Sequence, residues 1–237
     1  MAVLTGDHGK FESASRVVIH GRVDDDVRGG IERCLAVAMD SLAIERVAVH
    51  ITGSNRRLPR GLVAGAASDG IWLRKSVLRE DRVLLSSILL EEAAHMKLIE
   101  LGAIDGLSSF IGALVNEFFA SWYTFYELMR VQPSITERFD DAPLPPGQAT
   151  LRTGYVLGAF LGAATAGIPA AQSRLDTWLN HGAGDPAVRS AVLRLRKLAE
   201  SAGSPLDMAL SIAEKFPRSS DSGGAAPSGG EGGGGRA

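Results

Sequence analysis

The hydrophobic pattern of the chain changes near residue 80, and this change limits the folds that the chain can adopt. Residues 15–80 alternate between strand and helix signals, because SRVVIHG and ERVAVHITG read as strands and DDDVRGGIERCLAVAMDSL reads as an amphipathic helix. Residues 81–216 show helical periodicity only. The sequence therefore predicts an α+β fold, with a small mixed β-sheet and one helix followed by a helix pair and a C-terminal helical bundle.

Four segments follow from this pattern. Residues 1–14 are an N-terminal extension, and residues 15–131 hold the sheet and the helix pair, with a further short strand in DGIWLRKSVL after the loop RLPRGLVAGAASDG. Residues 132–216 are expected to add three more helical segments, packed on the same domain. The tail, residues 217–237, has eight glycines among its last fifteen residues, and we expect it to be disordered because it cannot bury a core.

The segment LLEEAAHM, residues 89–96, places two adjacent carboxylates and a histidine inside an apolar helix. At about 100° per residue, His95 falls about 40° from Glu91 and shares a face with Leu84, while the solvated residues lie on the opposite side. Glu92 lies about 100° further round the helix. Burying an unpaired carboxylate costs several kcal/mol, so these groups need a charged partner, a proton or a cation.

A further inward-facing carboxylate lies on the next predicted helix, which runs from about Leu107 to Val131. Glu117, in the segment NEFFASWY, shares its face with the apolar residues Phe110 and Leu114. Two consecutive helices are therefore predicted to direct acidic side chains towards the core.

This order of elements, with Glu-x-x-His on one helix and NEFFASWY on the next, resembles the zincin metallopeptidases. The resemblance covers the sheet and the helix pair. It implies a zincin-like metallopeptidase domain, in which a bound zinc ion and a glutamate activate water to hydrolyse a peptide bond. It also implies that His95 is the second histidine of the HExxH motif, Glu92 the general base and Glu117 a third metal ligand. Tyr123 or Tyr126, just beyond Glu117, would stabilise the oxyanion.

The sequence departs from the HExxH pattern at its first position, where Glu91 stands in place of histidine. A glutamate one turn before His95 can ligate a metal through oxygen, so the predicted ligands are Glu91, His95 and Glu117. This set is harder and more anionic than the usual one, which weakens the preference for Zn²⁺ and makes Mn²⁺ or Fe²⁺ suitable as well. It also makes the metal a poorer Lewis acid.

Two functional hypotheses follow. In the first, the protein is a metal-dependent peptidase that acts on a peptide or protein substrate. In the second, catalysis is lost, no metal is held, and the protein is a zincin-like binding or regulatory protein. Its acidic pocket is then neutralised by protonation or by an arginine, for which Arg16, Arg46, Arg74 and Arg152 are available.

Other chemical classes of site are not supported. A di-iron carboxylate bundle needs a second Glu-x-x-His motif, which the other histidines do not supply. Serine or cysteine nucleophile chemistry is also unsupported, because the sequence has no GxSxG motif and Cys34 falls on the apolar stripe of a predicted helix.

The sequence also argues against nucleic acid and membranes as partners. The net charge is −2, and no basic cluster is longer than NRR with Arg60 nearby. The segment GYVLGAFLGAATAGIPAA, residues 154–171, is weakly hydrophobic and rich in small residues, so it predicts a tightly packed helix rather than a membrane span. The opening residues MAVLTGDHGK lack the apolar region of a secretory signal, which favours a cytoplasmic location.

Overall fold

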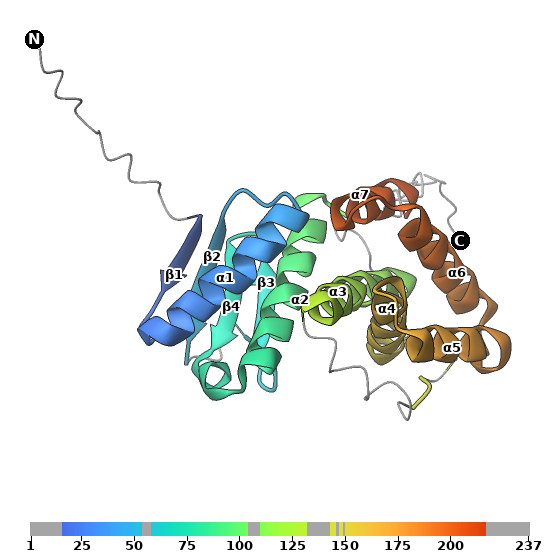
Figure 1. The fold of residues 1–237 in the computed structure, drawn as a ribbon, viewed down its shortest axis with the longest axis horizontal. Helices are drawn as coiled ribbons and strands as arrows, with labels where there is room; N and C mark the ends of the chain where they lie inside the picture. The colour runs from blue at the N-terminus through green and yellow to red at the C-terminus, as the bar shows by residue number, and fades with distance from the viewer. Residues whose placement is uncertain are drawn as a thin grey trace, which may run out of the picture.

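The computed structural model describes residues 16–53, 58–103, 110–131, 143–145, 147–148 and 150–216. The predicted N-terminal extension and Gly/Ser-rich tail lie outside these residues. The elements follow in the order β1 (Val17–His20), α1 (Asp25–Ser41), β2 (Val47–Thr52), β3 (Ala64–Ala67), β4 (Gly70–Arg74), the 3-10 helix η1 (Lys75–Arg79), α2 (Arg82–Glu100), α3 (Phe110–Val131), α4 (Leu151–Thr165), α5 (Pro169–Thr177), the π-helical turn η3 (Trp178–Gly182), α6 (Pro186–Ser201) and α7 (Pro205–Lys215). The predicted α+β class is confirmed, because a sheet with its helix precedes a series of packed helices (Figure 1).

The four strands form one mixed sheet in the order β1-β2-β4-β3. β1, β2 and β4 are parallel, and β3 pairs antiparallel with β4 at the edge. Alternate side chains of the central strands point to one face, where Val47, Val49, Ile71 and Leu73 are fully buried. α1 and α2 pack on the sheet, and α2 also packs on α3 (Figure 1). α2 therefore joins the sheet to the helical part of the molecule.

The segment RLPRGLVAGAASDG was predicted to be a loop throughout, and this is wrong, because it contains the edge strand β3. The strand pairs with β4, and the guanidinium of Arg74 holds the preceding segment by donating to the carbonyl oxygens of Leu58 at 3.1 Å and Pro59 at 3.0 Å. The strand residues AGAA include no β-branched or aromatic side chain, so the strand depends on this long-range pairing rather than on local propensity. The strand predicted in DGIWLRKSVL ends at Arg74, where η1 begins.

α2 has a well-defined start and an apolar middle. The carboxylate of Asp81 caps the helix by accepting hydrogen bonds from the backbone N–H groups of Val83 and Leu84. In the middle of the helix, Leu90 and Ala94 are buried on either side of the acidic pair. The cap and these buried contacts fix the rotation of the helix, and with it the direction of its charged side chains.

α4 packs closely on α3 through three glycines spaced one turn apart. A methyl group on Gly154, Gly158 or Gly162 would lie 2.6, 2.2 or 2.2 Å from a backbone oxygen of α3. Only a residue without a side chain allows the two backbones to approach this closely. The packed helix predicted in this region is confirmed.

From residue 150 to residue 216, which the structure describes throughout, the chain forms four α-helices rather than the three segments predicted, since α4 and α5 are separated just before Pro169. α6 packs on α3 and α4, and α7 packs on α6 and α2. Within the described ranges, no helix combines the length and the hydropathy that a membrane crossing requires.

Candidate metal site

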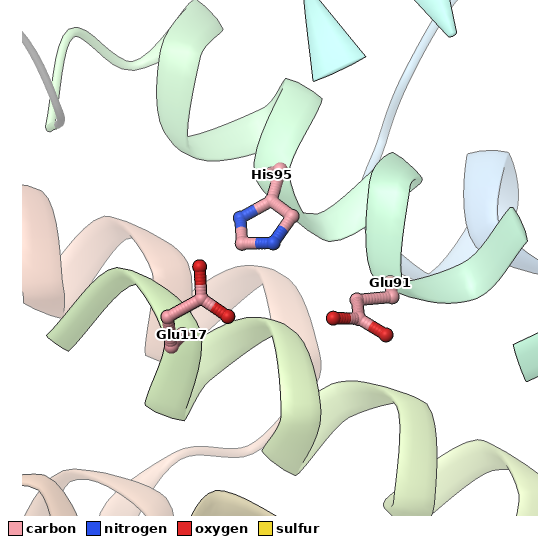
Figure 2. Close-up of side chains that lie close together, drawn as sticks. All are labelled: Glu91, His95 and Glu117. Carbon is pink, nitrogen blue, oxygen red and sulfur yellow. The ribbon is translucent and has the colours of Figure 1, made fainter. Parts of the chain in front are cut away.

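Three side chains that could ligate a metal converge between α2 and α3. Glu91 and His95 lie one turn apart on α2, and Glu117 faces them from α3 (Figure 2). One carboxylate oxygen from each glutamate and one ring nitrogen of His95 lie within 4.8 Å of one another. Ligand atoms around one tetrahedral Zn²⁺ are about 3.4 Å apart, so small side-chain rotations would complete the coordination. The convergence predicted from the helical periodicity is confirmed.

The ring of His95 is oriented by the residue that precedes Glu117. Nδ1 of His95 lies 3.0 Å from Oδ1 of Asn116. An amide oxygen only accepts hydrogen bonds, so in the tautomer that carries its proton on Nδ1 this contact is a hydrogen bond and the lone pair of Nε2 is available to a cation. Figure 2 shows one ring nitrogen of His95 directed between the two carboxylates. Asn116 was not among the predicted site residues, although it forms part of the NEFFASWY segment.

Burial and mutual repulsion raise the pKa values of the carboxyl groups at the site. The pKa of Glu91 rises to about 7, mainly through burial and then through the charge of Glu117. Burial and the charges of Glu91 and Glu117 raise the pKa of Glu92 to about 8, although a hydrogen bond with the backbone of Ala66 lowers it in part. Burial also raises the pKa of Glu117, although the electrostatic interaction with His95 acts to lower it. A divalent cation would relieve this repulsion.

Glu92 connects the site to the edge of the sheet. Its hydrogen-bond partner Ala66 lies in the edge strand β3. The backbone N–H of Arg74 donates to the carbonyl oxygen of Val63, so Val63 is hydrogen-bonded to the partner strand. In an antiparallel pair, only every second residue of a strand forms hydrogen bonds with that partner. The backbone N–H and carbonyl groups of Ala64 and Ala66 therefore point away from β4, towards the side on which Glu92 approaches.

No family model, curated protein or solved structure matches this chain. Among the described residues, the Glu-His-Glu group between two packed helices has the composition and spacing of a metal site.

The structure places neither Tyr123 nor Tyr126 at the Glu-His-Glu group. Tyr123 is fully buried, and its hydroxyl lies 2.7 Å from Oγ of Ser41 on α1. The ring of Tyr126 stacks on that of Trp122 and lies beneath the guanidinium of Arg130. At about 100° per residue, both tyrosines project well away from the face of α3 that carries Glu117.

Tyr155 of α4 is the tyrosine whose titration responds to the site. Its pKa rises to about 12, first through burial and then through the charges of Glu91 and Glu117. Tyr155 was not predicted as a site residue, because its position depends on how closely α4 packs on α3. The phenol stays protonated at neutral pH and is therefore a hydrogen-bond donor.

Two of the arginines considered as neutralising partners are engaged elsewhere. Nη1 of Arg16 lies 2.7 Å from a carboxylate oxygen of Asp40. Arg74 donates to backbone carbonyl groups in the segment before β3. The structure therefore gives these two arginines roles in fixing loops and helix ends.

We expect the metal-free protein to lose stability as the pH rises. Glu91 and Glu92 keep their protons in the folded state up to pKa values of about 7 and 8, whereas in the unfolded chain both lose them near 4.5. The folded state binds more protons between these values, so the free energy of unfolding falls from about pH 4.5 to about pH 8. We expect a loss of roughly 3 kcal/mol after allowing for partial solvent access. Urea denaturation in the presence of a chelator measures it.

The double variant E91Q/E92Q is the control for this pH dependence, because glutamine keeps the shape of the side chain and does not titrate. The other ionisable groups are the same in both proteins, so the difference between the two pH profiles isolates Glu91 and Glu92. Parallel profiles for the parent and the double variant would show that these carboxyl groups do not have raised pKa values.

Proposed function

We propose that Glu91, His95 and Glu117 bind a divalent cation and that the protein is a zincin-like, metal-dependent peptidase with an altered ligand set. The observation that carries the proposal is the approach of the three ligand atoms to within 4.8 Å of one another. When bound, the cation would supply Lewis acidity towards a carbonyl group and water. Two carboxylates and one imidazole suit Zn²⁺, Mn²⁺ and Fe²⁺.

Glu92 has the properties of the general base in this proposal. It lies next to the ligand Glu91, and its pKa of about 8 lies near neutral pH, where a side chain exchanges protons most effectively. Its hydrogen bond with Ala66 holds it beside the edge strand. Unpaired backbone groups of an edge strand can pair with an extended peptide. A peptide or protein substrate is therefore proposed, and a cytoplasmic location remains part of the proposal.

Tyr155 replaces Tyr123 and Tyr126 as the proposed stabiliser of the oxyanion. Its hydroxyl group carries a proton at neutral pH, and the charges of Glu91 and Glu117 contribute to its raised pKa. A hydrogen bond from this donor to the developing negative charge would lower the barrier of the reaction.

A second candidate is a binding or regulatory protein that has lost catalysis. The observation that favours it is the raised pKa of Glu91, which allows this carboxyl group to be half-protonated near neutral pH without a metal. Glutamate at the first position of the motif also weakens zinc binding relative to histidine. In this case the pocket is neutralised by protons.

Metal binding and hydrolysis, measured on the purified full chain, separate the two candidates. Equilibrium dialysis with Zn²⁺, Mn²⁺ or anaerobic Fe²⁺ should show one ion per chain. We expect His95→Ala to lower the affinity by roughly 100-fold or more, because it removes the only imidazole. Glu92→Gln should keep the ion and slow the hydrolysis of a peptide library by about 100- to 10,000-fold, since an amide cannot accept the proton.

His181→Ala is the matched control, because His181 is exposed on η3 and its removal should leave metal affinity unchanged. Equal affinities for His95→Ala, His181→Ala and the parent would exclude the proposed site. Full metal occupancy without hydrolysis in the parent would reject the peptidase and leave a metal-binding protein. Neither occupancy nor hydrolysis would support the regulatory candidate.

A further inference from the structure

A cavity of about 520 Å³ lies at the edge of the sheet where the parallel strands end. Residues 21–24, which follow β1, form one wall together with the first turn of α1, and η1, which follows β4, forms the other. β1, β2 and β4 are parallel, so their carboxyl ends meet at this edge. Open parallel sheets bind ligands outside the carboxyl ends of their strands. The volume also falls within the range of small-molecule sites, about 300–1,000 Å³.

Cationic residues dominate the charge of this cavity. Four of them line it, two on each wall: Arg22, Arg28, Lys75 and Arg79. Among the described residues in the lining, Asp24 is the one acidic residue. None of the four cations forms an ion pair with another residue that the structure describes. The lining therefore carries an excess of three positive charges at neutral pH. Because the cations come from two segments that are distant in sequence, no basic cluster in the sequence marks them.

The other acidic residues that are near these cations in sequence lie outside the lining. Asp25 and Asp26 belong to the first turn of α1, and Asp26 is paired with Arg82 at 2.7 Å. Glu80 follows η1 directly but does not line the cavity. The positive charges on the two walls repel each other, and an anion bound between the walls would relieve this repulsion.

We propose that this cavity binds the phosphoryl group of a small soluble molecule, such as a phosphate monoester. A guanidinium group presents several N–H donors in a fixed plane, and this arrangement matches the oxygens of a phosphate. A monoester carries a charge of about −1.5 to −2 at neutral pH, so it offsets most of the positive excess, whereas a single carboxylate offsets less. The bound anion bridges the two walls and holds the segment after β1 close to η1.

Three aromatic ligands of similar size test the proposal on the full chain. Calorimetric titration at low salt and about pH 7.5 should show saturable binding of phenyl phosphate, at least about 10-fold tighter than that of phenylacetate, which carries one negative charge. Phenol, which is uncharged, should show no measurable binding. Added salt should weaken the binding of phenyl phosphate, because counterions screen exposed charges. Equal binding of phenyl phosphate and phenylacetate would overturn the proposal.

Substitutions on the two walls test whether both walls contact one anion. Arg22→Gln and Arg79→Gln should each weaken the binding of phenyl phosphate by roughly 5- to 10-fold. Both side chains are exposed, so both variants should keep the fold. Arg46→Gln is the matched control, because Arg46 is an exposed arginine just before β2, at the opposite edge of the sheet, and this variant should bind as the parent does. Equal losses in all three variants, or an unchanged affinity in Arg79→Gln, would overturn the proposal.

Two further probes distinguish a small soluble ligand from other sources of a phosphoryl group. A single-stranded oligonucleotide and vesicles that contain phosphatidic acid should show no binding that depends on Arg22 and Arg79. Tight binding of either probe that is lost in Arg22→Gln and Arg79→Gln would assign the cavity to nucleic acid or to a membrane and would overturn the proposal. None of Glu91, His95 and Glu117 lines the cavity, so His95→Ala should bind phenyl phosphate as the parent does, which keeps this test independent of the metal site.

Discussion

Replacing Glu91 with histidine is expected to raise the affinity of the protein for Zn²⁺ by roughly 100-fold at neutral pH. The variant restores an imidazole one turn before His95, which gives the HExxH spacing. It also removes a carboxyl group whose pKa of about 7 makes zinc compete with a proton. Repulsion with Glu117, which contributes to that raised pKa, disappears as well. Competition with a coloured zinc chelator at about pH 7 measures the change.

Glu214→His is the control for added histidine, because Glu214 is an exposed helical glutamate on α7. It changes charge and composition in the same way and should leave zinc affinity close to that of the parent. An equal gain in both variants would mean that the new histidine binds zinc without the help of His95 and Glu117. If Glu91→His binds no zinc at all, the three positions do not form a metal site.

The sequence predicted the part of the site that depends on which face of its own helix each side chain occupies. Glu91, His95 and Glu117 each lie on the apolar face of a helix, and a helix that buries that face must carry the polar side chains inward. Because the two helices are consecutive, their inward faces were expected to meet. Local periodicity was sufficient to predict this convergence.

The same reasoning could not find Tyr155 or the hydrogen bond of Glu92 with Ala66. Tyr155 approaches the carboxylates because α4 packs on α3 at backbone distance, and a local hydrophobic pattern does not specify which helices become neighbours. Ala66 lies in a strand without strand-forming side chains, which pairing with β4 stabilises. Both contacts arise from tertiary packing rather than from propensity.

In the fold, too, local patterns predicted some features, whereas others depend on tertiary packing. The change of periodicity near residue 80 predicted the sheet, its helix and the helix pair, because burial of one face requires a repeat of two in strands and 3.6 in helices. The predicted number of C-terminal helices was wrong for the described residues 150–216, since the short turn before Pro169 divides what reads as one apolar segment. Because that segment is rich in small residues, its pattern does not show where a helix ends. The same small residues allow α3 and α4 to pack closely.

Gly158→Ala is expected to lower the free energy of unfolding by about 3 kcal/mol or more, one of the largest effects of a single methyl group in this protein. The added carbon would lie 2.2 Å from the carbonyl oxygen of Phe118, so α4 must move away from α3. That movement would open contacts between two buried helices and carry Tyr155 away from Glu91 and Glu117. Thermal unfolding should show a melting temperature lower by roughly 6–12 °C.

Gly30→Ala is the matched control, since it makes the same change within helix α1 at a position where the new carbon meets no atom within 4 Å. Alanine favours a helix over glycine, so this variant should be more stable than the parent by about 0.5–1 kcal/mol. The two substitutions therefore shift stability in opposite directions, because one carbon meets a backbone oxygen and the other meets open space. A gain of stability in Gly158→Ala would mean that α3 and α4 are not in backbone contact, and the position of Tyr155 beside the carboxylates would lose its physical basis.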